Sequence, residues 1–242
     1  MGTLMQTNVT IAGLGWVGKP FAESLKIYGY NVKGSVTDPK KAVALSKSGL
    51  MAYPMVISED GVSGMVETLL SNTDILVCMI PPGLRRNTGA NYALKMAKFL
   101  EAIETSKIKK LILISSTSVY ADPQGTVTEK DVPLPETEAG KQLYEECTVL
   151  RFGGLYGGSR NPVKFLAGRK DLANGDAPVN LIHREDCIGI LLEIIQQDAF
   201  GHIINAVYPA HPLKKVYYVE QAKKLGLDPP KYSSKEEATH KQ

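Results

Sequence analysis

Near its N-terminus the chain reads Val9-Thr10-Ile11-Ala12-Gly13-Leu14-Gly15-Trp16-Val17-Gly18. Residues 9–12 form a mostly apolar run that predicts a β-strand, and the three glycines behind it have the spacing G-x-G-x-x-G. Apolar side chains then recur at helical spacing, at Val17, Phe21, Leu25 and Tyr28. A strand, a glycine loop and an amphipathic helix in this order are the start of a Rossmann-type unit.

Each glycine of the loop has its own expected role. Gly13 permits the tight turn off the strand, Gly15 removes a side chain where a pyrophosphate must approach, and Gly18 lets the helix pack closely on the sheet. The first turn of the helix offers N–H groups to the phosphates. We therefore expect residues 13–18, that is Gly13, Leu14, Gly15, Trp16, Val17 and Gly18, to bind NAD or NADP. The alternative is a glycine turn that merely closes a strand–helix junction.

Apolar runs alternate with helical segments along most of the chain. The runs are 9–12, 31–35, 75–80, 111–115 and 147–152, and a clear helical segment covers 91–105. This alternation predicts an α/β fold, a doubly wound parallel sheet with helices on both faces. We expect one Rossmann domain over residues 1–242, in which about 153–182 and 203–242 form a small substrate-side lobe.

Composition excludes several classes of protein. A formal charge of +3 is too small for a nucleic-acid surface, and Cys78, Cys147 and Cys187 lack metal-ligand spacing. No segment reaches the 18 apolar residues of a membrane span, and the first residues do not resemble a secretory signal. We expect a cytoplasmic protein with a small-molecule substrate, and neither nucleic acid nor membrane as partner.

The end of the second predicted strand bears on the choice between the two cofactors. The position of the usual ribose-binding acid falls on Val36, which is not a carboxylate. Ser35 and Thr37 can face a 2′-phosphate, and the lysines at 40 and 41 can add positive charge. These residues favour NADP, whereas the nearby Asp38 keeps NAD open. Ile80, Pro81 and Pro82 end the next central strand and are expected to line the cofactor.

Four later segments resemble successive landmarks of the NAD-dependent epimerase/dehydratase family, the extended and atypical short-chain dehydrogenases/reductases. They are Ile114-Ser115-Ser116-Thr117-Ser118-Val119-Tyr120, Arg151 to Gly157, Val179 to Asp186, and Ile204 to Ala206. The stretches TIAGLGWVGKP, SSTSVYADPQGTV and NPVKFLAG are most similar to a small bacterial YeeZ-like branch. The resemblance implies that Asp186 caps a helix, and that a homodimer is a possible assembly.

The resemblance also implies a catalytic set. Ser116 matches the family's hydroxyl position, with Ser115 beside the cofactor, and Lys141 matches the lysine of a Tyr-x-x-x-Lys pair. The tyrosine of that pair is replaced by Thr137, and Tyr144, one helical turn after Lys141, is a substitute to weigh against simple packing.

Two functions follow from these expectations. The leading one is an NAD(P)-dependent oxidoreductase that acts on a sugar-nucleotide-like or small carbonyl or hydroxyl substrate. The alternative is a dinucleotide-binding sensor or scaffold that has lost its acid/base group, because the tyrosine of the Tyr-x-x-x-Lys pair is absent.

Overall fold

The computed structural model of the 242-residue chain describes residues 6–81, 91–120, 127–130 and 147–233. The chain forms two compact units. Unit 1 contains residues 1–151 and 188–205, and unit 2 contains residues 152–187 and 206–242. The assignment of 153–182 and 203–242 to a substrate-side lobe stays a prediction, because it concerns a function of these residues.

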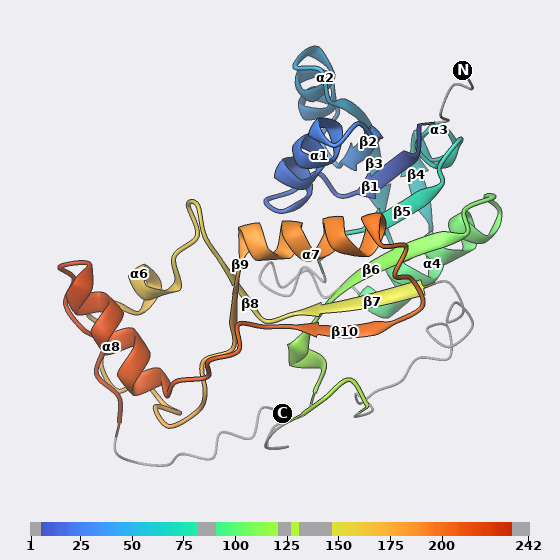
Figure 1. Cartoon of the computed structure of the whole chain (residues 1–242). Coiled ribbons are helices and arrows are strands. Elements are labelled where there is room, and N and C mark those ends of the chain that lie inside the picture. The colour runs from blue at the N-terminus through green and yellow to red at the C-terminus, as the bar shows by residue number, and fades with distance from the viewer. Residues whose placement is uncertain (1–5, 82–90, 121–126, 131–146, 234–242) are drawn as a thin grey trace. The chain divides into compact units, whose positions relative to one another are not determined.

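A large sheet forms the centre of unit 1 (Figure 1). Its eight strands lie in the order β10-β7-β6-β5-β1-β2-β3-β4. In chain order they are β1 (Asn8–Ala12), β2 (Asn31–Val36), β3 (Met51–Ile57), β4 (Val62–Gly64), β5 (Ile75–Cys78), β6 (Lys110–Ser116), β7 (Cys147–Phe152) and β10 (Ile203–Ala206). The helices between them are α1 (Gly18–Ile27), α2 (Pro39–Lys47), α3 (Val66–Leu70) and α4 (Tyr92–Glu104), and the 3-10 turn η2 (Thr117–Val119) follows β6.

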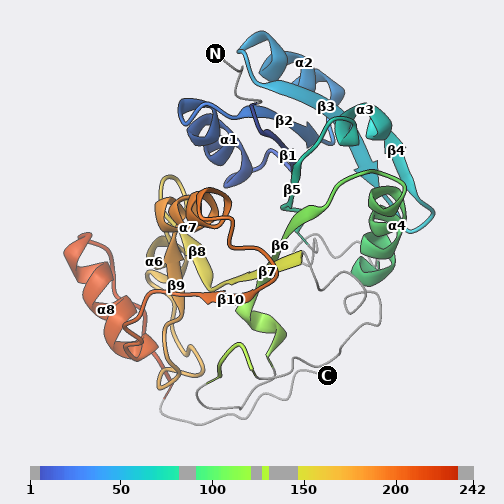
Figure 2. The same ribbon diagram turned by 45° about the vertical axis from the view of Figure 1, so that its right-hand side comes forward.

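The sheet is parallel from β6 through β5, β1 and β2 to β3, and β4 pairs antiparallel at its edge. The chain moves from β1 to β2 and β3 in one direction across the sheet, and from β5 to β6 in the other. Because parallel crossovers are right-handed, the two directions place helices on opposite faces. Figure 2 shows α1 and α2 on one face and α3 and α4 on the other. The prediction of a doubly wound α/β fold is therefore confirmed.

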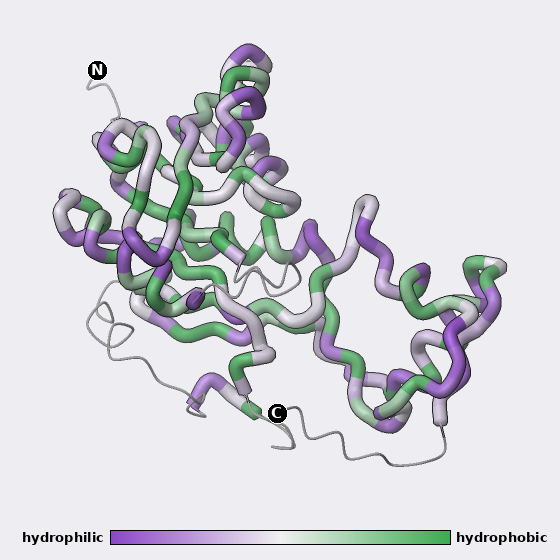
Figure 3. The backbone as a smooth tube through the Cα atoms, turned by 180° about the vertical axis from the view of Figure 1, so that it is seen from behind, coloured by the Kyte–Doolittle hydropathy of each residue, from purple (hydrophilic) through white to green (hydrophobic). Residues whose placement is uncertain are grey.

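The core of unit 1 explains why its central strands are apolar on both faces. On the face of α3 and α4, side chains from β5 and β6 pack against Leu69, Phe99 and Ile103. On the other face, Phe21 and Leu25 of α1 are fully buried. Figure 3 shows much of the sheet as hydrophobic. A strand covered by helices on both sides has no polar face to expose, so its residues do not alternate.

Unit 2 has a smaller core. Its elements are β8 (Gly154–Tyr156), β9 (Leu181–His183), α6 (Pro162–Leu166), α8 (Lys214–Lys224) and the start of α7 (Arg184–Gln196), which continues into unit 1. The strands β8 and β9 pair in parallel. Val163, Val179, Tyr218 and Ala222 form the buried cluster.

Replacement of Phe99 tests the core of unit 1. Phe99 is fully buried on α4, so Phe99→Ala is expected to lower the free energy of unfolding by about 3–5 kcal/mol, because it removes apolar contacts and leaves a cavity. Leu94→Ala on the same helix is the control, since Leu94 is 40% exposed and its loss is expected to cost less than about 1 kcal/mol. Urea unfolding of both variants measures the difference, and equal losses would contradict this description of the core.

Candidate functional site

The glycine loop lies at the point where the sheet changes direction. β1 has β2 on one side and β5 on the other, and the loop follows the carboxyl end of β1. Open parallel sheets bind their ligands at this position. The carboxyl ends of β2, β5 and β6 lie along the same edge of the sheet as that of β1, because the four strands are parallel. Residues distant in sequence are thereby gathered around the loop.

Two of the three glycines are required by the protein's own packing. Gly13 has a φ of +111°, and a Cβ there would lie 2.8 Å from the carbonyl oxygen of Met79. A Cβ on Gly18 would lie 2.2 Å from the carbonyl oxygen of Gly13. Both distances are shorter than van der Waals contact. Gly13 and Gly18 thus allow the turn to fold back against the start of α1 and against the end of β5.

Gly15 differs from the other two glycines. It is exposed, its φ is not positive, and no described atom lies within 4 Å of the position that a Cβ would take. The protein's own packing therefore gives no reason for a glycine at this position. A ligand whose phosphates approach the backbone closely does give one. Among the described residues no side chain caps α1, so the first turn of this helix can direct its N–H groups to an anion.

The loop is fixed to β2 through Ser35. The backbone N–H of Leu14 donates to the carbonyl oxygen of Ser35 (2.7 Å), and that of Gly13 donates to Ser35 Oγ (3.1 Å). Ser35 is 3% exposed. Its hydroxyl is therefore part of the loop's internal structure. We had expected from the sequence that it would face a 2′-phosphate, but it does not point outward. Leu14 also turns its side chain inward, since a Cβ on Gly34 would lie 2.6 Å from its Cγ.

The residues after β2 are more accessible. Val36 is apolar and 7% exposed, whereas Thr37 is exposed. The carboxylate of Asp38 accepts a hydrogen bond from the backbone N–H of Lys40 (2.9 Å) and so caps α2. The ammonium of Lys41 lies 3.5 Å from the carbonyl oxygen of Leu14, at the glycine loop. A cation thus lies beside the loop, an exposed hydroxyl follows β2, and the nearby carboxylate is engaged with its own helix.

An apolar residue, Ile80, lies just after the end of β5. Ile80 packs against the core, and its carbonyl oxygen accepts a hydrogen bond from the hydroxyl of Tyr92 (3.0 Å). Burial raises the pKa of Tyr92 and raises that of Cys78 to about 12, so both groups are neutral at physiological pH. Pro81 is exposed, and Pro82 lies outside the described residues.

The last two residues of β6, Ser115 and Ser116, are serines. Ser116 is exposed, and its Oγ accepts hydrogen bonds from the backbone N–H (3.2 Å) and the Oγ (3.0 Å) of Ser118. Ser115 is half-buried in the strand. Ser118 was not singled out from the sequence. Its position two residues after Ser116, at a strand end, is the signal that could have drawn attention to it, because this is the spacing of a local side-chain cap.

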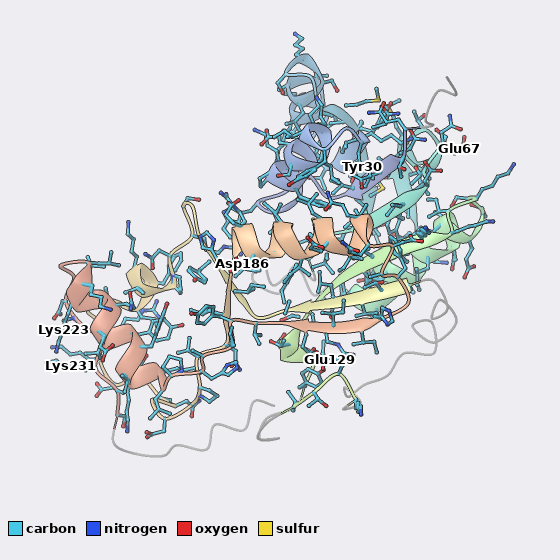
Figure 4. The ribbon with its side chains drawn as sticks, in the orientation of Figure 1. Tyr30, Glu67, Glu129, Asp186, Lys223 and Lys231 are labelled. Carbon is cyan, nitrogen blue, oxygen red and sulfur yellow. The ribbon has the colours of Figure 1, made fainter. Side chains whose placement is uncertain are left out.

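Tyr120 anchors the turn that carries these serines. Its hydroxyl accepts a hydrogen bond from Arg151, and lies 2.9 Å from the carbonyl oxygen of Thr128 and 3.0 Å from Asn205 Oδ1. One hydroxyl has one hydrogen, so it donates to one of these two oxygens at a time. Glu129 accepts from the backbone N–H of Asn205 (2.9 Å; Figure 4). The segment after β6 is therefore held by β7 and β10.

The other candidate catalytic residues, Lys141 and Tyr144, lie outside the described residues, as does Thr137. The roles inferred for them from the family resemblance remain predictions.

Unit 2 has an aromatic and polar cluster around β8 and β9. The rings of Tyr156 and His183 meet edge to face with centroids 5.0 Å apart. Burial, with smaller contributions from Asp186 and Tyr208, raises the pKa of Tyr156. The sequence places His183 and Asp186 at one strand–helix junction but does not bring Tyr156 and Tyr208 to it, because these come from β8 and from a loop that follows β10.

The start of α7 corrects one expectation about this cluster. Asp186 was expected to cap the helix, but α7 begins at Arg184, and Asp186 lies within its first turn (Figure 4). The capping side chain is His183, whose Nδ1 accepts the backbone N–H of Glu185 (3.3 Å). Asp186 still favours the helix, because a negative charge in the first turn interacts well with the helix dipole.

Within the described ranges, every helix is either too short or too polar to span a lipid bilayer.

Comparison with known proteins places the chain in a family. No family model matches it. Protein YeeZ of Escherichia coli K12 is 36% identical over 238 residues, which cover 93% of this chain and 86% of YeeZ.

Solved structures share the fold at lower identity. UDP-glucuronic acid 4-epimerase from Bacillus cereus, in complex with NAD, has a TM-score of 0.69 and 17% identity, and the match covers 93% of this chain and 86% of that one. A structure from Methylobacillus flagellatus assigned to the NAD-dependent epimerase/dehydratases has a TM-score of 0.70 and 20% identity, over 94% of this chain and 85% of that one. The YeeZ-like resemblance inferred from the motifs is confirmed: the chain belongs to the YeeZ family, and it shares its fold with structures of NAD-dependent epimerase/dehydratases.

Proposed function

We propose that this protein is an NAD(P)-dependent oxidoreductase whose glycine loop holds the pyrophosphate of the cofactor. The open space at Gly15 is the observation that carries the proposal, since Gly13 and Gly18 are explained by packing alone and Gly15 is not. When bound, the cofactor supplies a hydride acceptor or donor. The protein's part is to hold it at the carboxyl edge of the sheet, between the loop and Ile80.

The substrate class we propose is a sugar nucleotide or another small molecule with a carbonyl or hydroxyl group. Support comes from the fold, because structures that share it include an epimerase of UDP-glucuronic acid. Ser116 is the proposed hydrogen-bonding residue for the reacting oxygen, as its exposed hydroxyl follows the strand next to β5 at the same edge of the sheet.

We further propose that NADP is preferred over NAD. Thr37 is exposed and Lys41 lies beside the loop, so a 2′-phosphate would meet a hydroxyl and a cation. A bare ribose hydroxyl would find no carboxylate at Val36, and Asp38 is engaged with the N-terminus of α2. Ser35 no longer supports this preference, since its hydroxyl is bonded to Gly13.

Two glycine variants separate cofactor binding from folding. Gly15→Ala is expected to change the free energy of unfolding by less than about 1 kcal/mol, because its Cβ meets no described atom. It is expected to weaken cofactor binding about tenfold or more, which corresponds to about 1.4 kcal/mol. Gly18→Ala is the matched control, since its Cβ overlaps the Gly13 carbonyl and should lower stability by at least about 1–3 kcal/mol.

Thermal unfolding with NAD, NADH, NADP and NADPH added separately measures both effects, because a ligand that binds only the folded state raises the unfolding temperature. A wild-type protein that none of the four stabilises, or a Gly15→Ala variant with undiminished cofactor shifts, would refute the proposed binding mode.

The cofactor preference is tested at Lys41. Lys41→Ala is expected to weaken NADP binding about fivefold and to leave NAD binding unchanged, because an exposed ion pair with a phosphate contributes about 1 kcal/mol. Lys47→Ala, in the last turn of the same helix, controls for loss of charge alone. Isothermal titration in low and high salt gives the affinities, and added salt should reduce the difference between the two cofactors. Equal losses for NAD and NADP would exclude this role.

Turnover distinguishes an enzyme from a sensor. If the protein is an oxidoreductase, it should oxidise NADPH or NADH in the presence of a carbonyl substrate, and Ser116→Ala should lower kcat about a hundredfold, as for the loss of a donor to a developing oxyanion. The absence of turnover across a panel of carbonyl compounds, with cofactor binding intact, would favour the sensor that the missing tyrosine suggests.

A further inference from the structure

The two hydrogen bonds from Ser118 to Ser116 determine what Ser116 can do. A serine hydroxyl has two lone pairs and one hydrogen. Both lone pairs of Ser116 Oγ are occupied, one by the backbone N–H of Ser118 at 3.2 Å and the other by its hydroxyl at 3.0 Å. No described residue accepts the hydrogen of Ser116, which can therefore point outward, where this residue is exposed.

We propose that Ser118 is a positioning residue that makes Ser116 a hydrogen-bond donor only. The inference rests on the proposed function, because it assumes that Ser116 contacts the reacting oxygen. Two incoming hydrogen bonds also polarise the outgoing O–H, since hydrogen bonds in a chain strengthen one another. Ser118 thereby directs the Ser116 hydrogen and makes it a stronger donor.

A donor-only Ser116 restricts the chemistry of the substrate. The group facing it must be an acceptor, such as a carbonyl oxygen. A bound reduced nicotinamide would supply hydride to the carbonyl carbon, and negative charge would then develop on the carbonyl oxygen as its π bond to carbon breaks. Ser116 stabilises that charge through its hydrogen bond. The proton that completes the alcohol must come from a different acid. In the reverse direction, the proton must leave to a different base, because Ser116 has no lone pair to receive it.

The 3-10 turn η2, which contains Ser118, is fixed at its C-terminal end by contacts of Tyr120. The backbone N–H of Tyr120 donates to the carbonyl oxygen of Thr117 (3.3 Å), which closes the 3-10 turn. The ring of Tyr120 lies against the guanidinium of Arg151, with the guanidinium carbon 5.0 Å from the ring centroid. Tyr120 is 9% exposed and Arg151 is 4% exposed. Ser118 is therefore presented to Ser116 by a turn whose end is buried in unit 1.

A simpler role for Ser118 would be to stabilise the turn alone. Ser116 already accepts the backbone N–H of Ser118 in the manner of a helix cap, and that bond needs no Ser118 side chain. The additional bond from Ser118 Oγ is the one that occupies the second lone pair. If Ser118 only stabilises the turn, its loss should lower stability and activity whether or not Ser116 is present. If Ser118 directs the Ser116 hydrogen, its loss should lower activity only when Ser116 is present.

A double-mutant cycle separates the two roles. The variants are Ser118→Ala, Ser118→Thr, Ser116→Ala and the double alanine variant, and the probe is reduction of 9,10-phenanthrenequinone by NADPH or NADH. Ser118→Ala is expected to lower kcat about fivefold, the value of one hydrogen bond, without changing the KM for the cofactor. Ser118→Thr, which keeps the hydroxyl, is expected to restore most of the rate. In the Ser116→Ala background, Ser118→Ala should have no further effect on kcat.

Several results would overturn the proposal. The first is a fully active Ser118→Ala variant. The second is an equal loss of kcat on adding Ser118→Ala to the wild type and to Ser116→Ala. The third is a wild-type protein whose unfolding temperature rises with cofactor but which does not reduce the quinone. The rise in unfolding temperature on adding cofactor tests the proposed cofactor binding independently of the role of Ser118. If no cofactor binds, the proposed function fails, and amide hydrogen exchange at residue 118 still tests the backbone hydrogen bond to Ser116 Oγ. Its protection should fall in Ser116→Ala and be kept in Ser118→Ala, and unchanged protection in both would refute the contact.

Discussion

The close approach of Gly18 to the carbonyl group of Gly13 is the constraint on which the site depends. With a Cβ position only 2.2 Å from that oxygen, no residue other than glycine allows α1 to start where it does. The turn is held from the other side by Ser35, which bonds the backbone of both Gly13 and Leu14. Because the loop is fixed by contacts within unit 1, its shape is set before any ligand arrives. Gly15 alone is left open within it.

The parallel arrangement of the strands brings further residues to the edge of the sheet that carries the glycine loop. β1, β2, β5 and β6 run in the same direction, so the residues after their carboxyl ends meet along one edge. Thr37, Ile80 and Ser116 each follow or end a different strand, yet all belong to the edge that carries the glycine loop. This topology explains why short motifs far apart in the sequence identify one functional region.

The central strands and long helices could be predicted, because strands buried on both faces give continuous apolar runs and α4 has a regular apolar face. β3 was missed, since Pro54 interrupts its run and suggests a loop. Ser35 was misjudged because residue type shows that a hydroxyl is present but not which way it points. The cap of α7 was assigned to Asp186, whereas the helix starts at Arg184 and its cap, His183, lies three residues before Asp186.

The direction of the serine hydroxyls limits the search for the missing acid/base group. A phenol is present close in sequence at Tyr120, but it is buried, it accepts a hydrogen bond from Arg151, and it donates to an oxygen of Thr128 or Asn205. The hydrogen of the Tyr120 hydroxyl is therefore already donated within the protein and is not available to a substrate. Ser116, with both lone pairs occupied, cannot act as base either. If hydride transfer occurs, the proton must move through a residue outside this network. The sequence offers Tyr144 as a substitute for the family's missing tyrosine, one helical turn after Lys141, the match to the family's lysine.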